Sequence, residues 1–258
     1  MMLPAHRRRR AGSLPVLILA GLAAAALSAF AASMRPAHAD ECAIPEELLQ
    51  DDSRLEMTKA HLAPGKTLKI VVIGGSSTAG TAAGSTDKSY PRRLQEILSE
   101  RHPGTTIVVE NKGLAHQSAQ QMLDRFDRDV IDEQPTLAIW ETGITDAVRG
   151  VDPEEFAVTM QSGLDRLKDS KIEAMLIDMQ FSRATASVIN FDSYLNALHH
   201  AADINDIYVF RRYQMMRYWS ENGVFDFDNW PKAGAQLAAR VYDCVARRLA
   251  DAIELVAR

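Results

Sequence analysis

A short segment rich in glycine and hydroxyl residues is the first place in this sequence where chemistry is expected. It reads "GGSSTAG", residues 74–80, and it follows the apolar run Leu68–Ile73 directly. A phosphate-binding loop would need a lysine after its last glycine, and Thr81 stands there. The glycines of the segment do not have the G-x-G-x-x-G spacing of a dinucleotide site. The remaining interpretation is a serine nucleophile on a tight turn, with backbone N–H groups facing the reaction centre.

The elements that would position this segment alternate between strands and helices. Short apolar runs predict five strands: Leu68–Ile73, Thr106–Val109, Thr136–Trp140, Ala174–Ile177 and Ile207–Phe210. Segments with helical period predict helices at Ser89–His102, Ser118–Glu133, Pro153–Lys168, Phe191–Ala202 and Lys232–Val256. Ser89 and Asp152 are expected as helix caps. This alternation predicts an α/β fold, a three-layer α/β/α sandwich with a parallel sheet of about five strands.

The carboxyl ends of parallel strands meet at one edge of the sheet, where ligands bind in such folds. Four segments are expected there: 74–80, 111–118, 141–150 and 178–183. Their shared position indicates a site more strongly than any one of them does.

These segments resemble the sequence blocks of the SGNH (GDSL-type) hydrolases. "IGGSSTAG" is similar to the first block, G-D-S-x-T, with Ser76 as the nucleophile and Gly75 in place of the aspartate. "NKGLAH" (111–116) resembles the second block and "WETGITDAVRG" (140–150) the third. "FDFDNWPKAG" (225–234) lies where the family has D-x-x-H. The resemblance covers about residues 68–255. It implies a flavodoxin-like fold, hydrolysis of acyl esters, and no cofactor or metal.

The resemblance also implies which residues form the site. The expected catalytic positions are Ser76, His116, Thr145, Asp226 and Asn229. The expected substrate-binding positions are Gly75, Gly113, Gly143, Asp146, Gln180 and Arg183. Three of the four signature residues differ from the family: His116 replaces the oxyanion glycine, Thr145 the oxyanion asparagine, and Asn229 the basic histidine.

Of these three replacements, the loss of the histidine has the largest expected effect on the rate of ester hydrolysis. The last histidine of the chain is His200, so no alignment places one at the start of the final helix. An asparagine cannot take up a proton at neutral pH. Loss of the base lowers the rate of a serine triad about 10⁴- to 10⁶-fold, or roughly 5–8 kcal/mol. His116 either replaces the base or fills space at the edge. Asp226 and Asp228 either act as weak bases or cap the last helix.

Other polar side chains also have two interpretations. Ser76 is either a nucleophile or a turn hydroxyl that bonds to nearby backbone. Arg183 either holds a carboxylate or phosphate group or forms a salt bridge. His199 and His200 are expected on a solvated helix face. Three tryptophans either stack on sugars or pack in the core or at its rim: Trp140, Trp219 and Trp230.

The N-terminus has the layout of a secretory signal. Residues 1–39 contain an arginine cluster, a long apolar run and Ala-His-Ala before Asp40. An uncleaved membrane anchor is the alternative. Removing the segment removes five arginines, so the charge becomes 24 − 34 = −10. Such a charge does not favour nucleic acid or an anionic membrane. The expected location is periplasmic or secreted, with a mature form that is soluble if the segment is cleaved.

Two cysteines survive this cleavage, Cys42 and Cys244. In an oxidising compartment they are expected to pair rather than bind a metal. The expected organisation is a signal peptide (1–39), an N-terminal extension tied by the disulfide (40–67), and an SGNH-hydrolase-like domain (68–258).

Three functional hypotheses follow. The favoured one is an exported protein derived from acyl-ester hydrolases, catalytically impaired, that binds acylated glycan, lipid or small esters as a ligand-binding or scaffold protein. The alternative is an active esterase or deacetylase that uses Ser76 with His116 as an unusual base. In the third, the protein acts through another surface of the molecule.

Overall fold

The computed structural model describes residues 40–227 and 230–258. The expected signal peptide, Asp228 and Asn229 lie outside the described residues. Five parallel strands form one sheet in the order β2-β1-β3-β4-β5. They span Thr67–Gly74 (β1), Thr106–Gly113 (β2), Leu137–Glu141 (β3), Glu173–Ile177 (β4) and Tyr208–Phe210 (β5). The five predicted strands and their parallel arrangement are confirmed.

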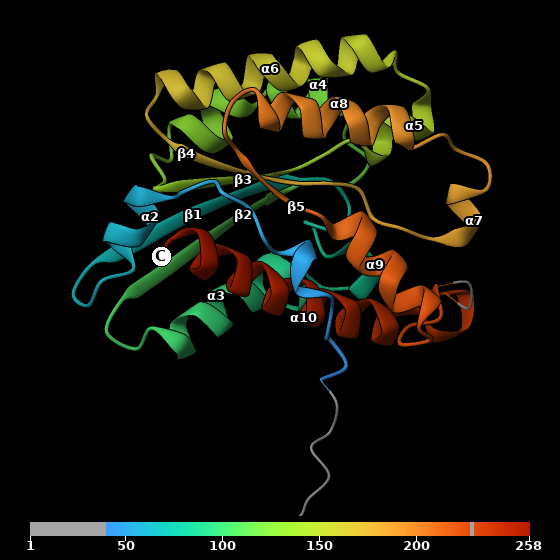
Figure 1. The fold of residues 1–258 in the computed structure, drawn as a ribbon, viewed down its shortest axis with the longest axis horizontal. Helices are drawn as coiled ribbons and strands as arrows, with labels where there is room; N and C mark the ends of the chain where they lie inside the picture. The colour runs from blue at the N-terminus through green and yellow to red at the C-terminus, as the bar shows by residue number, and fades with distance from the viewer. Residues whose placement is uncertain (1–39, 228–229) are drawn as a thin grey trace, which may run out of the picture. The chain divides into compact units, whose positions relative to one another are not determined.

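Helices cover both faces of the sheet, as predicted (Figure 1). One face carries α4 (Ala119–Leu123), α5 (Ile144–Arg149), α6 (Pro153–Asp169) and α8 (Asp192–Asp203). The other carries α2 (Glu56–His61), α3 (Tyr90–Arg101), α9 (Arg212–Glu221) and α10 (Trp230–Val256). A short helix, α7 (Arg183–Ala186), lies between β4 and α8.

The interior strand β1 shows why a continuous apolar run is needed. Ile70 and Val72 pack into the core on one face of the sheet, and Val71 and Ile73 pack into the core on the other. All four are fully buried. Successive side chains of a strand point to opposite faces, so a strand covered on both sides needs apolar residues at every position.

The predicted helix over Ser118–Glu133 is wrong as one continuous element. The chain forms α4 and then a π-helical turn, η4 (Asp127–Ile131). The π turn adds one residue to the repeat, and both Phe126 and Val130 remain fully buried. The helices α2, α5, α7 and α9 were not predicted. Short 3₁₀ turns include η1 (Glu46–Leu48), η2 (Thr81–Ala83) and η3 (Thr86–Lys88).

The two predicted caps differ in outcome. Asp152 accepts a hydrogen bond from the N–H of Glu154 at 2.8 Å, so this cap is confirmed. Ser89 occupies the capping position of α3, but its side chain makes no capping bond. Its hydroxyl instead accepts from Asn111 at 3.2 Å, because the residue is fully buried beside β2.

The disulfide between Cys42 and Cys244 is present, as predicted. It ties the start of the described chain to α10 across 202 residues. The segment before β1 is also held by hydrogen bonds, including Trp219 Nε1 to the carbonyl of Ala43 at 3.0 Å and Leu55 N to the carbonyl of Val256 at 2.9 Å. Within residues 40–227 and 230–258, no helix combines the length and apolar character needed to cross a membrane.

Candidate functional site

The glycine-rich segment forms a compact turn directly after β1. Successive backbone bonds close it, from Ala79 to the carbonyl of Gly75 and from Thr81 to that of Ser76, both at 3.0 Å. The turn packs so closely on the end of β2 that a Cβ atom at Gly113 would lie 2.3 Å from the nitrogen of Ala79. Gly113 is therefore required for packing. Gly75 is buried, and a Cβ atom there would be 3.9 Å from Met122.

The hydroxyl of Ser76 lies next to the second block. The backbone N–H of His116 donates to Ser76 Oγ at 3.2 Å. His116 has a φ of 62°, in the left-handed region that favours glycine, and its side chain is exposed. Arg149 donates to the carbonyl of His116 at 2.8 Å and holds this backbone in place. Residue 116 thus presents an amide to Ser76 where the family uses a glycine amide.

This contact uses Ser76 as an acceptor, whereas a nucleophile needs a group that accepts its proton. Among the described residues, no hydrogen bond takes the proton of Ser76 Oγ. The arrangement supplies a donor for an oxyanion, and among the described residues no base is hydrogen-bonded to Ser76.

The third block forms the start of α5. Gly143 precedes the helix with a φ of 98°, and a Cβ atom there would lie 3.3 Å from Met179. Thr145 is half-buried in the first turn. Asp146 is 2% exposed and accepts hydrogen bonds from the amide of Ala119 at 3.0 and 3.1 Å. Burial raises the pKa of Asp146 above its ordinary value. This carboxylate therefore joins α5 to the start of α4.

A buried hydrogen-bonded network centred on Glu141 and Arg212 lies beneath the turn, and it was not predicted from the sequence. Glu141 and Arg212 are each 2% exposed and form an ion pair at 3.1 Å. The second carboxylate oxygen of Glu141 accepts from Thr78 and, at 3.1 Å, from Tyr90. An acidic residue at the end of a wholly apolar strand was the signal that could have identified Glu141.

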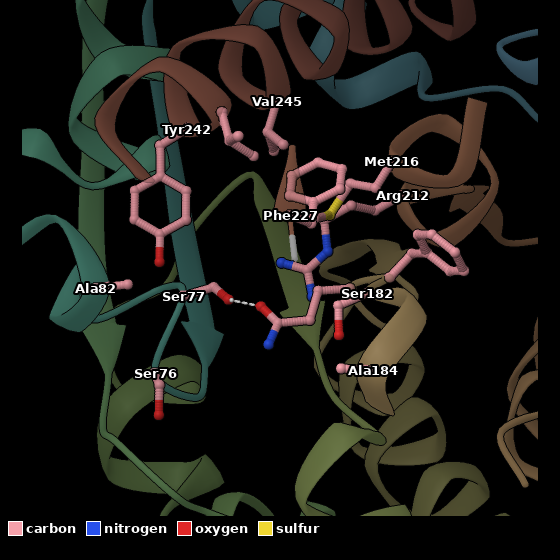
Figure 2. A pocket seen from close by; sticks show the side chains of 13 residues that line it. Ser76, Ser77, Ala82, Ser182, Ala184, Arg212, Met216, Phe227, Tyr242 and Val245 are labelled. Carbon is pink, nitrogen blue, oxygen red and sulfur yellow. Dashed lines mark hydrogen bonds between the residues drawn. The ribbon is translucent and has the colours of Figure 1, made fainter. Parts of the chain in front are cut away.

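A cavity of about 420 Å³ opens beside this network (Figure 2). Its walls are mainly apolar and come from the β4–α7 segment, α9 and α10. The lining residues are Ser76, Ser77, Ala82, Gln180, Phe181, Ser182, Ala184, Arg212, Met216, Phe227, Val241, Tyr242 and Val245. The hydroxyl of Ser76 points away from the other lining side chains (Figure 2).

Polar groups converge at one end of the cavity. Ser77 donates to Gln180 Oε1 at 3.0 Å, and the Tyr242 hydroxyl points toward Ser77 (Figure 2). Burial raises the pKa of Tyr242 to about 12, and the charge of Glu141 adds to this effect. The phenol therefore stays protonated at neutral pH and can act only as a neutral donor or acceptor.

The structure brings some of the predicted site residues together and leaves others apart. Gln180 lines the cavity, whereas Arg183 is exposed and donates to the backbone carbonyl of Ser220 at 3.4 Å. Asp226 is exposed, next to the lining residue Phe227. Within the described residues, no three histidine, cysteine, aspartate or glutamate side chains are grouped so that they could hold a metal ion.

The prediction that His199 lies on a solvated face is wrong. Its Nε2 is 3.1 Å from the carboxylate of Asp178, which is 1% exposed at the end of β4. The amide of Tyr213 also donates to Asp178, at 2.7 Å. A helical pattern alone could not show that this carboxylate faces α8. His200 is exposed, as predicted.

The tryptophans whose side chains are described serve packing. Trp140 and Trp219 are both fully buried, and the ring nitrogen of Trp140 lies 3.2 Å from the sulfur of Met122. A Cβ atom at Gly163 would lie 2.4 Å from the Trp140 ring, so α6 can approach β3 only with glycine there.

Known proteins similar to this chain are esterases and lipolytic proteins. An arylesterase of Vibrio mimicus is 25% identical over 112 residues, which span 43% of this chain and about half (54%) of that protein. A variant of Axe2, an acetyl-xylooligosaccharide esterase from Geobacillus stearothermophilus, superposes with a TM-score of 0.62 at 18% identity over 75% of this chain and 96% of its own. A G-D-S-L-family protein of Desulfitobacterium hafniense, described as lipolytic, superposes with a TM-score of 0.55 at 23% identity over 71% and 98% of the two chains.

The structural likenesses show the fold of the predicted superfamily. The family itself follows from a match over residues 41–258 to the model of the non-GDSL lipase-like family. The chain therefore belongs to the non-GDSL lipase-like family, and its fold is that of the SGNH/GDSL-type hydrolases.

Proposed function

We propose that this protein is exported and binds acylated ligands in the cell envelope, with a serine that no longer hydrolyses esters efficiently. The ligands are acylated glycans, lipids or small esters; an acetyl-xylooligosaccharide esterase and a lipolytic protein are among the similar proteins. A ligand-binding or scaffold role in the periplasm or outside the cell suits a chain with an apparent secretory signal and a disulfide.

The observation that carries this proposal is the state of Ser76. Its hydroxyl accepts a hydrogen bond from the His116 amide, and no described group accepts its proton. Without a base, an oxyanion site and substrate binding together give only about 10³- to 10⁴-fold catalysis over water. The cavity, in contrast, has the volume and apolar lining of a small-molecule site.

The same contact favours one alternative, hydrolysis by Ser76 with the His116 imidazole as base. The backbone of residue 116 contacts the hydroxyl and its side chain is exposed, so a rotation of that side chain would be needed to bring the imidazole to Ser76. The left-handed backbone at this residue works against the alternative, because it is suited to glycine and needs no histidine.

Labelling with a fluorophosphonate and turnover of p-nitrophenyl acetate test both functions. We expect no adduct at Ser76 and a rate equal to that of Ser76→Ala. An adduct and a rate that depend on Ser76 would overturn the proposal. The alternative then requires that His116→Gly and His116→Asn both abolish turnover. These replacements tolerate a positive φ, so they remove the imidazole without disturbing the amide.

Export is tested separately, by fractionating cells and sequencing the N-terminus of the purified protein. We expect the chain to begin at Asp40. Recovery of the intact N-terminus with the membrane fraction would support the anchored alternative instead.

A further inference from the structure

The cavity contains a buried cation with a hydrogen-bond donor that has no partner. Arg212 is 2% exposed and lines the cavity (Figure 2). Within the described part of the chain, its Nε has no hydrogen-bond partner. A buried donor without a partner is unfavourable. A ligand in the cavity that brings an acceptor to this guanidinium gives it a partner.

The charge of Arg212 is already neutralised by the protein. Glu141 pairs with it at 3.1 Å. Burial acts to lower the pKa of Arg212, but interactions with Glu141, Tyr90, Asp178 and Tyr242 together raise it. A carboxylate entering the cavity would meet the two protein carboxylates and would lose its hydration. An uncharged acceptor avoids both penalties.

The rest of the cavity suits a chain of apolar groups. Phe181, Phe227, Val241 and Val245 form its walls. Met216 follows Arg212 by one helical turn on α9 and lines the same space (Figure 2). Its unbranched side chain can change rotamer as a ligand approaches the guanidinium.

We propose that this cavity binds the apolar chain of an uncharged acyl ester or amide, with the carbonyl oxygen accepting from Arg212, and that it disfavours the free acid. The inference rests on the proposed binding function and specifies its ligand. Ser76 lines the cavity, but its hydroxyl points away from Arg212 and the other lining side chains (Figure 2), so we expect a carbonyl bound at Arg212 not to be attacked. The ligand is therefore bound intact.

Calorimetric titration with octanamide, methyl octanoate and sodium octanoate tests the inference. We expect the amide and the ester to bind at least about 10-fold more tightly than the acid, a difference of about 1.4 kcal/mol. Equal or tighter binding of octanoate would overturn it. If the protein hydrolysed methyl octanoate, the proposed function would fail, while octanamide would still report on the cavity.

Two variants test whether the ligand binds inside the cavity. Ala184→Phe fills the cavity from an exposed lining position and is expected to weaken octanamide binding at least 10-fold. Val188→Phe is the matched control, because Val188 is 80% exposed and does not line the cavity. If both variants bound octanamide like the original protein, the ligand would not lie in the cavity.

The role of Arg212 is tested with the double variant Glu141→Gln/Arg212→Met, which removes the donor without leaving an unpaired charge. We expect it to lose the preference for octanamide over octanoate. An unchanged preference in a folded double variant would rule out Arg212 as the recognition group.

Discussion

Glu141→Gln removes one negative charge from the buried network beneath the Ser76 turn. Glu141 and Arg212 are each 2% exposed, so the arginine left behind is largely shielded from bulk water. Breaking one partner out of a buried ion pair costs about 3–5 kcal/mol, whereas exposed pairs contribute about 0–1 kcal/mol.

The contacts set the expected value near the lower end of that range. Glutamine keeps one carbonyl oxygen that can accept from Arg212, and its amide group can donate to the hydroxyl of Thr78 or Tyr90. The change therefore removes charge and keeps the hydrogen bonds. We expect a loss of about 3 kcal/mol in the free energy of unfolding. For a domain of this size that corresponds to a Tm lower by roughly 6–12 °C.

Urea unfolding, with the midpoint and the slope fitted separately, measures this loss. Glu221→Gln is the control, because Glu221 forms an ion pair with Arg217 on the outer side of α9, with both side chains more than half exposed. We expect the control to lose less than about 0.5 kcal/mol. The double variant Glu141→Gln/Arg212→Met is expected to recover most of the stability. A Glu141→Gln loss no larger than that of the control would refute this account of the network.

Three further predictions concern other parts of the fold. Replacing Cys42 and Cys244 together by alanine should lower the free energy of unfolding by about 5 kcal/mol in the chain-entropy treatment, measured by urea titration; a loss below about 1 kcal/mol would contradict it. His116→Gly should raise stability by up to about 1 kcal/mol in the same assay, because it relieves the left-handed backbone; a lower stability would show that the imidazole contributes. A hydrogen bond from Arg128 lowers the pKa of Asp129 from 3.8 to about 2, so the folded state gains stability above pH 4 and loses it as the pH falls toward 2. Asp129→Asn should remove that part of the acid dependence, by up to about 2 kcal/mol, and an unchanged pH profile would argue against it.

The sheet was predictable because its signal is local. Each strand is a short apolar run, and a run such as Leu68–Ile73 can be satisfied only when both faces of the strand are covered. The position of the Ser76 turn was also predictable, because the glycine-rich segment 74–80 directly follows this apolar run. The π turn after α4 could not be predicted, because the periodicity of its apolar residues is that of an ordinary helix.

The site was only partly predictable. The contact between the His116 amide and Ser76 was predictable, because the resemblance to the SGNH hydrolases assigned both residues to one site. The Glu141–Arg212 pair joins residues 71 apart in the sequence, and nothing in either segment indicates its partner. The cavity could not be predicted either. It is the space left by side chains from several elements, and its existence depends on how closely those elements pack.

The disulfide between Cys42 and Cys244 joins the two ends of the domain, and their separation in the sequence limits when the bond can form. Cys42 leaves the ribosome 202 residues before its partner does. All five strands and every helix before α10 are synthesised between Cys42 and Cys244. The covalent bond can therefore form only after the residues of the whole sheet have been synthesised.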